Sequence, residues 1–154
     1  MAATMKSVRA ALDPEEPDYA KARRLGAAAI PHLRQLVMGG DQMLATKATY
    51  LAGLIGTRAG VALVTQAAVH PNPAVRVAAA TAARELELSS ATPIISQLLG
   101  DSDRGVRQRA LRSVGARLTP ELQARIEHLM EVDQDLLIRK EAAALIGQSS
   151  STRR

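Results

Sequence analysis

Apolar residues recur along this chain at the three- and four-residue spacing of amphipathic helices. The segments AAAIPHLRQLVMGG, GVALVTQAAVH, ATPIISQLLGD and TPELQARIEHLMEVD each place apolar residues at or near positions i, i+3, i+4 and i+7. Thr119 before Pro120 predicts a helix N-cap and a first-turn proline, and Pro93 after Thr92 predicts another first-turn proline. No stretch has the alternating β-branched pattern of a strand. The pattern therefore predicts an all-α fold.

A second pattern follows each of these helices and repeats. In DSDRGVRQRALRSVG, residues 101–115, Asp101 is followed five residues later by Val106, and then by Arg107. The same order recurs from three other anchor residues, each with its own pair of residues in the Val-Arg place: Asp133 (Ile138-Arg139), His70 (Val75-Arg76) and, less closely, Asp41 (Thr46-Lys47). The four anchors are 29, 31 and 32 residues apart, and a degenerate copy begins at Asp13. A near-constant period predicts a repeat array.

Each unit is expected to be a helix, a tight turn and a second helix. Turn-forming residues separate the two helices at 39–40, 71–73 and 101–103. A single hairpin has two apolar faces and cannot cover both, so neighbouring hairpins must stack into a solenoid with a continuous core. We expect one domain over residues 1–147, in units of about 1–26, 27–56, 57–86, 87–117 and 118–147, and a disordered tail over 148–154.

The combination of Pro93, Asp101, Val106 and Arg107 resembles the HEAT repeat. The form V-R-x-x-A-x-x-x-V-G also resembles the phycobilisome-lyase-type subset of HEAT-like repeats. The resemblance implies a right-handed α-α superhelix of about five helical hairpins. It further implies that an acid and a basic residue from successive units stack as a polar ladder at the turns inside the units. The expected ladder residues are Asp41, Lys47, His70, Arg76, Asp101, Arg107, Asp133 and Arg139.

Elementary physical chemistry agrees with such a ladder. An acid just ahead of a helix is favoured by the amides of its first turn and can cap them. The planar fork of an arginine can bridge the acid of its own unit and that of the next unit. His70 departs from the acidic pattern. We interpret it as a neutral hydrogen-bonding substitute for aspartate, with a pH switch or a ligand as the alternative.

The sequence offers no constellation that favours catalysis. His32 and His128 stand alone on helices, Glu15-Glu16 lies in a proline-bracketed turn, and the serine runs have no histidine and acid at triad spacing. No glycine pattern matches a phosphate-binding loop. We therefore expect no catalytic residue, no metal and no cofactor, and a protein that is not an enzyme.

Composition narrows the class of protein further. Apolar residues make up 47% of 154 residues but aromatic residues only 1%, which predicts an Ala, Leu, Val and Ile core and helix-on-helix packing. The net charge of +5 permits an acidic or polyanionic partner. Without cysteine there is neither a disulfide framework nor a thiolate. No signal peptide and no membrane-length apolar window is present, so we expect a cytoplasmic protein.

The remaining candidate for a functional feature is a binding surface. By resemblance, the second helices line the concave side, and positions two, three and six after the Val place should face outward. This surface would be small and apolar in the middle and basic towards both ends. The expected partner-binding residues are Lys21, Arg24, Thr49, Val77, Ala78, Thr81, Gln108, Arg109, Arg112 and Lys140. The alternative is that its alanines only favour helix formation.

The leading hypothesis is a non-catalytic scaffold for protein-protein interaction, which would act as an adaptor or as a regulatory or inhibitory binding protein. Its partner would be another protein, such as one with an acidic or helical segment. A protein that binds the nucleic-acid backbone is the first alternative, although the near absence of aromatic residues disfavours base stacking. A bilin-lyase-like accessory protein is the second alternative. The apolar last helix also suggests weak self-association through the C-terminal end.

Overall fold

Helices and short connections make up residues 2–152, the part of the chain that the computed structural model describes. This confirms the predicted all-α class. In chain order the elements are α1 (Met5–Leu12), α2 (Tyr19–Ala22), the 3₁₀ segment η1 (Arg23–Ala29), α3 (Ile30–Val37), α4 (Gln42–Ile55), α5 (Arg58–Ala67), α6 (Pro73–Ala83), α7 (Leu88–Leu98), α8 (Arg104–Val114), α9 (Pro120–Val132) and α10 (Leu136–Ser151).

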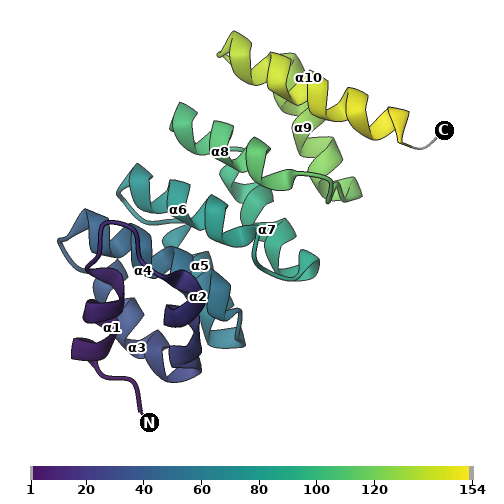
Figure 1. Cartoon of the computed structure of the whole chain (residues 1–154). Coiled ribbons are helices and arrows are strands. Elements are labelled where there is room, and N and C mark those ends of the chain that lie inside the picture. The colour runs from purple at the N-terminus through teal and green to yellow at the C-terminus, as the bar shows by residue number, and fades with distance from the viewer. Residues whose placement is uncertain (1, 153–154) are drawn as a thin grey trace.

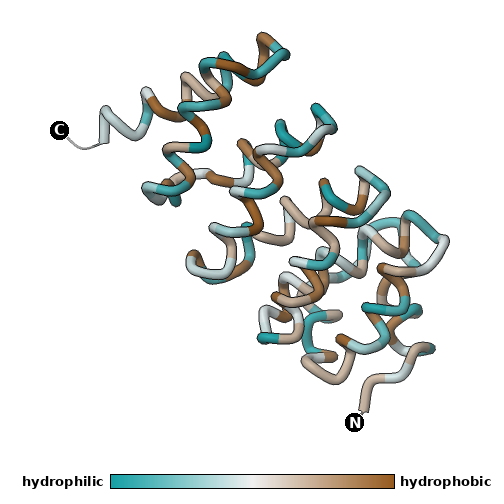
Figure 2. The backbone as a smooth tube through the Cα atoms, turned by 180° about the vertical axis from the view of Figure 1, so that it is seen from behind, coloured by the Kyte–Doolittle hydropathy of each residue, from teal (hydrophilic) through white to brown (hydrophobic). Residues whose placement is uncertain are grey.

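Successive helices pair into antiparallel hairpins that stack side by side (Figure 1). The hairpins are α3–α4, α5–α6, α7–α8 and α9–α10, and the helices of each pair contact one another. The second helices α4, α6, α8 and α10 contact each other in sequence, and so do the first helices α3, α5, α7 and α9. Hydrophobic positions recur in every hairpin from one end of the stack to the other (Figure 2). The fold is therefore the expected solenoid, with its core running between the two rows of helices.

The core is built from small and aliphatic side chains, as the composition predicts. Its largest fully buried members are leucines and isoleucines such as Leu51, Leu98 and Ile126. Small residues bring the second helices close together: a Cβ atom added to Gly53 of α4 would come within 2.8 Å of the Cβ and the carbonyl oxygen of Ala82 in α6. Close helix packing is thus specified at particular positions rather than by aliphatic content alone.

The N-caps of the second helices set the register of the repeat. Asp41, Asn72, Asp103 and Asp135 each accept a backbone hydrogen bond at the start of α4, α6, α8 and α10. The third residue after each cap is largely buried, and these four residues are Leu44, Val75, Val106 and Ile138. The caps recur at intervals of 31, 31 and 32 residues. They are more regular than the anchors at 41, 70, 101 and 133.

This register corrects the alignment of the second unit. Asp41 corresponds to the capping residue Asn72 and not to His70, so the expected alignment of that unit is two residues out. Leu44 and Ala45 stand in the Val-Arg place, and both are buried. The error arose because the sequence does not distinguish an aspartate that caps a helix from an aspartate elsewhere in the turn. The N-cap is the residue whose side chain accepts from the first amides of the helix that follows.

Three other local expectations have definite outcomes. Thr119 caps α9 and Pro120 is its first residue, as predicted. Pro93 does not lie in a first turn, because α7 already begins at Leu88. The proline leaves the carbonyl of Ser89 without its usual helical donor, and Ser89 is exposed, so water can supply the missing hydrogen bond.

Part of the expected C-terminal tail is helical in the structure. The helix α10 continues through Ser151, although we expected disorder from residue 148. The hydroxyls of Ser149 and Ser150 donate to the carbonyl of Ile146 at 2.8 and 3.2 Å, which keeps these side chains on the helix. Residues 153–154 of the expected tail lie outside the described residues. In the described part of the chain, no helix has the length and apolar character needed to cross a membrane.

Candidate functional site

Arginines in two of the second helices join successive hairpins on the side where the turns inside the hairpins lie. Arg76 of α6 donates from Nε and Nη2 to both carboxylate oxygens of Asp101, at 2.8 and 3.0 Å. Arg107 of α8 forms the same pair of bonds to Asp133, at 2.8 and 3.1 Å. The Nη1 group of each arginine also donates to the backbone carbonyl of its own anchor, His70 or Asp101. Each arginine therefore ties the end of its own first helix to the acid of the next unit.

The acids also order their own turns, and are not N-caps. Asp101 accepts from the amide of Asp103 at 2.8 Å, and Asp133 accepts from the amide of Asp135 at 2.9 Å. Burial raises the pKa of Asp133, but the hydrogen bonds from Arg107 and from the Asp135 amide outweigh burial and hold that pKa below its usual value. Asp133 is therefore a charged structural residue at neutral pH.

The other expected ladder residues do not form rungs, by which we mean ion pairs between successive hairpins such as Arg76–Asp101. Lys47 points to the N-terminal segment, where its Nζ donates to the carbonyls of Leu12 and Pro14 at 3.0 and 2.7 Å. Asp41 caps α4 through the amide of Leu44. Arg139 lies in the α9–α10 hairpin, and its side chain forms no hydrogen bond or ion pair within residues 2–152.

His70 takes over only the turn-forming part of the aspartate's role. Its Nδ1 accepts from the amide of Asn72 at 3.0 Å, as Asp101 accepts from Asp103. Ala45 occupies the place of Arg76 in the preceding unit, so an acid at position 70 would have no arginine to pair with. A neutral acceptor therefore suffices at this turn, in keeping with the interpretation of His70 as a substitute for aspartate.

The corrected register identifies the outward residues of the second helices. They lie five, six and nine residues after each N-cap, and we call them the second-helix face: Thr46, Lys47, Tyr50, Val77, Ala78, Thr81, Gln108, Arg109, Arg112, Lys140, Glu141 and Ala144. All of them are half-buried or exposed. Thr49 was expected on this face and is fully buried, with its hydroxyl bonded to the Ala45 carbonyl. Counting from the N-cap would have replaced it with Thr46 and Tyr50.

The N-terminal segment occupies the α4 part of the second-helix face. The ring of Tyr19 packs edge-on against Tyr50, with ring centroids 4.8 Å apart. Lys47 is held by the turn after α1 through the two carbonyls at residues 12 and 14. The segments α1, α2 and η1 all contact α4. A partner on this face would therefore meet α6 and α8 rather than α4.

On α6 the second-helix face carries no charge. Val77, Ala78 and Thr81 are all half-buried, and the Thr81 hydroxyl is satisfied by the carbonyl of Val77 at 3.2 Å. The neighbouring Arg109 on α8 is half-buried, and its side chain has no carboxylate partner within residues 2–152. The uncharged α6 part of the second-helix face and Arg109 thus lie on neighbouring helices, α6 and α8, which contact each other.

The basic character predicted for the α8 end is partly neutralised. Glu141 of α10 accepts from Arg112 at 2.9 Å and from Gln108 at 2.8 Å. The hydrogen bond from Arg112 is the main reason why the pKa of Glu141 lies below its usual value. Arg112 and Gln108 therefore link α8 to α10, and Lys140 remains exposed beyond them.

Lys21 and Arg24 belong to a different hollow. They are exposed and border a space of about 600 Å³ between α1 and α2, whose floor includes Ala10, Ala22 and Leu25. The first unit is incomplete at this end, because α2 has a single turn and the backbone changes direction at Gly26 with φ 63°. The structure does not bring these two cations to the apolar patch of α6.

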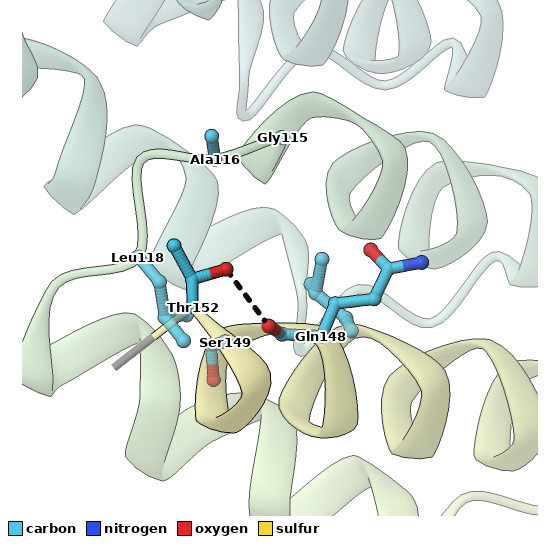
Figure 3. A pocket seen from close by; sticks show the side chains of 7 residues that line it. Gly115, Ala116, Leu118, Gln148, Ser149 and Thr152 are labelled. Atoms are coloured by element: carbon cyan, nitrogen blue, oxygen red, sulfur yellow. Dashed lines mark hydrogen bonds between the residues drawn. The ribbon is translucent and has the colours of Figure 1, made fainter. Parts of the chain in front are cut away.

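A second hollow lies at the other end of the stack. A space of about 360 Å³ lies between the α8–α9 connection and α10, lined by residues such as Leu118, Gln148 and Thr152 (Figure 3). The Thr152 hydroxyl is bonded to the Gln148 carbonyl at 3.2 Å. None of its lining residues is an acid, a histidine or a lysine. Across residues 2–152, no three potential metal-ligating side chains gather at one place.

Comparison with protein families decides the class. A sequence model of HEAT repeats matches residues 30–113 and again residues 61–147. The chain belongs to the HEAT-repeat family. This HEAT array is also similar to a chain in the structure of the complex of CpcE and CpcF of phycocyanin lyase from Nostoc sp. PCC7120, with a TM-score of 0.70 and 15% sequence identity over 92% of this chain and 96% of that chain. At this identity the likeness shows the fold alone. No curated protein sequence matches the chain.

Proposed function

We propose that this HEAT-repeat chain is a non-catalytic scaffold, an adaptor or regulatory protein, that binds another protein through its second-helix face. The observation that carries the proposal is the uncharged patch of Val77, Ala78 and Thr81 on α6, with Arg109 on the neighbouring α8, which has no carboxylate partner in the described part of the chain. Small side chains allow a partner helix to approach closely, and an arginine without a carboxylate favours an acidic residue on that helix. The partner we propose is an amphipathic helical segment with at least one acid.

The perturbed acids support a structural rather than a chemical role for the charged residues. The pKa values of Asp133, Asp135 and Glu141 all lie below their usual values, and each acid is held by an arginine of the neighbouring hairpin. General acids and bases usually have a pKa close to the working pH. A carboxylate in that role would need a raised pKa, whereas the pKa values of these three acids are lowered. These groups hold successive hairpins together, and that leaves binding as the proposed task of the surface.

The similarity to a chain of a phycocyanin lyase complex also fits a protein-binding role, because that structure is described as a complex of two proteins. A lyase-accessory role is the alternative that this likeness supports. It makes a separate prediction: mixing the chain with a bilin and an acceptor protein would produce a new visible absorption band. We expect no such band, since the chain contains no cysteine and only 1% aromatic residues to surround a tetrapyrrole.

The experiment is a capture assay from the organism that encodes the chain. Wild type and the V77E/A78E variant are immobilised, and the proteins they retain are compared quantitatively. We expect the two glutamates to abolish retention, because they place two negative charges on the apolar patch beside Arg109. Circular dichroism and the melting temperature confirm that the variant is folded. The single A78E change is a milder test, because it leaves the half-buried Val77 in place.

The matched control is A62E/T65E in the same hairpin. Ala62 and Thr65 are exposed on α5, so these changes add the same charge on the first-helix side. The control should retain the partner as wild type does. Equal retention by V77E/A78E and wild type, or equal loss in both double variants, would contradict the assignment of the second-helix face.

A further inference from the structure

The outer side of the last hairpin corresponds to surfaces that are covered elsewhere in the stack. A shift of 32 residues carries α8 onto α10, so that Arg107 corresponds to Arg139 and Leu111 to Ala143. In α8, Arg107 binds the next unit's Asp133 and Leu111 is buried. In α10, Arg139 has no acid within residues 2–152, and Ala143 is exposed. The α10 side of this end therefore keeps the chemistry of an internal interface.

The α9 side of the same end is acidic. The same shift carries Ile95 of α7 and Leu99, the residue directly after α7, onto Glu127 and Glu131 of α9, and both Ile95 and Leu99 are buried. Glu131 is exposed, and Glu127 is half-buried with a hydrogen bond from Gln123 at 2.9 Å. Two positions that are buried and apolar in the preceding hairpin have thus become carboxylates in the hairpin that also carries Arg139, which has no acid partner within residues 2–152.

The acids and the arginine lie at matching heights on the two helices. Arg139 is the fourth residue of α10, while Glu131 and Glu127 are the second and sixth residues from the end of α9. Counted from the turn of this antiparallel hairpin, the backbone positions of the two glutamates are each two residues from that of Arg139, which is about 3 Å of helix rise. A two-fold axis parallel to the helices would place α10 of one copy over α9 of the other at these levels.

We propose that two copies of this chain associate through these outer sides into a two-fold symmetric dimer. In this dimer Arg139 of each copy lies against Glu127 and Glu131 of the other, with Ala143 and the exposed Leu136 between them. The face carries both a cation and its complement, which a closed, self-complementary interface requires. The second copy supplies the carboxylates that Arg76 and Arg107 obtain from the next hairpin.

Symmetry argues against the N-terminal end as the partner of this surface. A head-to-tail contact would leave both ends open and extend into a filament. The two-fold arrangement closes instead. It lies apart from Val77 and Ala78, so it and the proposed partner-binding face can fail separately.

The test is sedimentation equilibrium of the full-length chain over a wide concentration range at low and high salt. We expect a monomer–dimer equilibrium that shifts towards monomer as salt rises, because the contacts are ion pairs near the surface. The variants R139E and E127R/E131R should each weaken the dimer roughly tenfold or more, since like charges then face each other. The triple variant R139E/E127R/E131R exchanges the signs and should restore it.

Each alternative outcome overturns the proposal. A wild-type chain that remains monomeric throughout, or a mass that grows beyond a dimer, contradicts the closed two-fold contact. Variants that dimerise as wild type does, or a triple variant that stays as weak as its parents, contradict the assignment of these charges. Unchanged helicity and melting temperature show that each variant is folded, and the conservative R139K variant should keep the dimer.

Discussion

Replacing Arg107 with methionine would remove the rung between the last two hairpins and keep an unbranched side chain in place. Arg107 gives Asp133 two hydrogen bonds, of 2.8 and 3.1 Å, and donates two more to the carbonyls of Asp101 and Ser102. The Asp133 side chain is only 3% exposed. In the variant it would be a buried carboxylate with no cation, which water cannot reach without local rearrangement.

The magnitude follows from this burial. Breaking a buried ion pair by removing one partner costs about 3–5 kcal/mol. The Arg107 side chain keeps 15% exposure, so we expect a loss at the lower end, about 3 kcal/mol. Arg139 is the matched control, because it holds the same position one unit later and pairs with no acid in residues 2–152. Arg139→Met should change stability by less than about 0.5 kcal/mol.

The assay is urea denaturation followed by circular dichroism, at concentrations low enough to keep every variant monomeric. Combining Arg107→Met with Asp133→Asn completes a double-mutant cycle, and neutralising the acid should recover much of the loss. A changed slope with urea would indicate that the last hairpin unfolds on its own. Equal losses for Arg107→Met and Arg139→Met would refute the argument that the rung between hairpins, and not the arginine itself, provides the stability.

Three further predictions concern the packing, the acid response and the surface charge. Gly53→Ala should lower stability by about 1–2 kcal/mol in a denaturant titration, since the added Cβ meets Ala82 at 2.8 Å, whereas Gly147→Ala, in open space, should raise it by about 0.5–1 kcal/mol. The pKa of Asp133 is lowered on folding, so its contribution is full above its ordinary pKa of 3.8 and is lost as the pH falls further; the melting temperature of wild type should therefore decline more steeply in acid than that of Asp133→Asn. A duplex DNA titration at two salt concentrations should show no steep salt dependence, because Arg112 is already paired with Glu141.

The period of the chain predicted the stack of hairpins because every unit repeats the same local chemistry. The sequence alone could not decide which acid of each turn carries which task. In Asp101-Ser102-Asp103 the first acid binds the neighbouring arginine and the second caps the helix, yet the residues are identical. The second unit has only Asp41 in this region. Its role as an N-cap became clear only from the hydrogen bond that it accepts from the amide of Leu44.

The outward residues were predicted well where the register was right. Val77, Ala78 and Thr81 lie on the surface as expected, whereas Thr49 of the misaligned unit is buried. The covering of α4 by the N-terminal segment depends on the contact between Tyr19 and a residue 31 positions later, which no local pattern contains. Tertiary contacts of this kind therefore limit what the sequence can say about the candidate site.

The most direct test of the binding account is site-specific photo-crosslinking in the organism that encodes the chain. A photoreactive amino acid replaces Ala78 on α6 in one variant and the exposed Ala62 on α5 in another. The account predicts a discrete crosslinked protein from position 78 and none from position 62. Crosslinks of equal yield at the two positions, or a partner captured only from position 62, would contradict a partner-binding second-helix face.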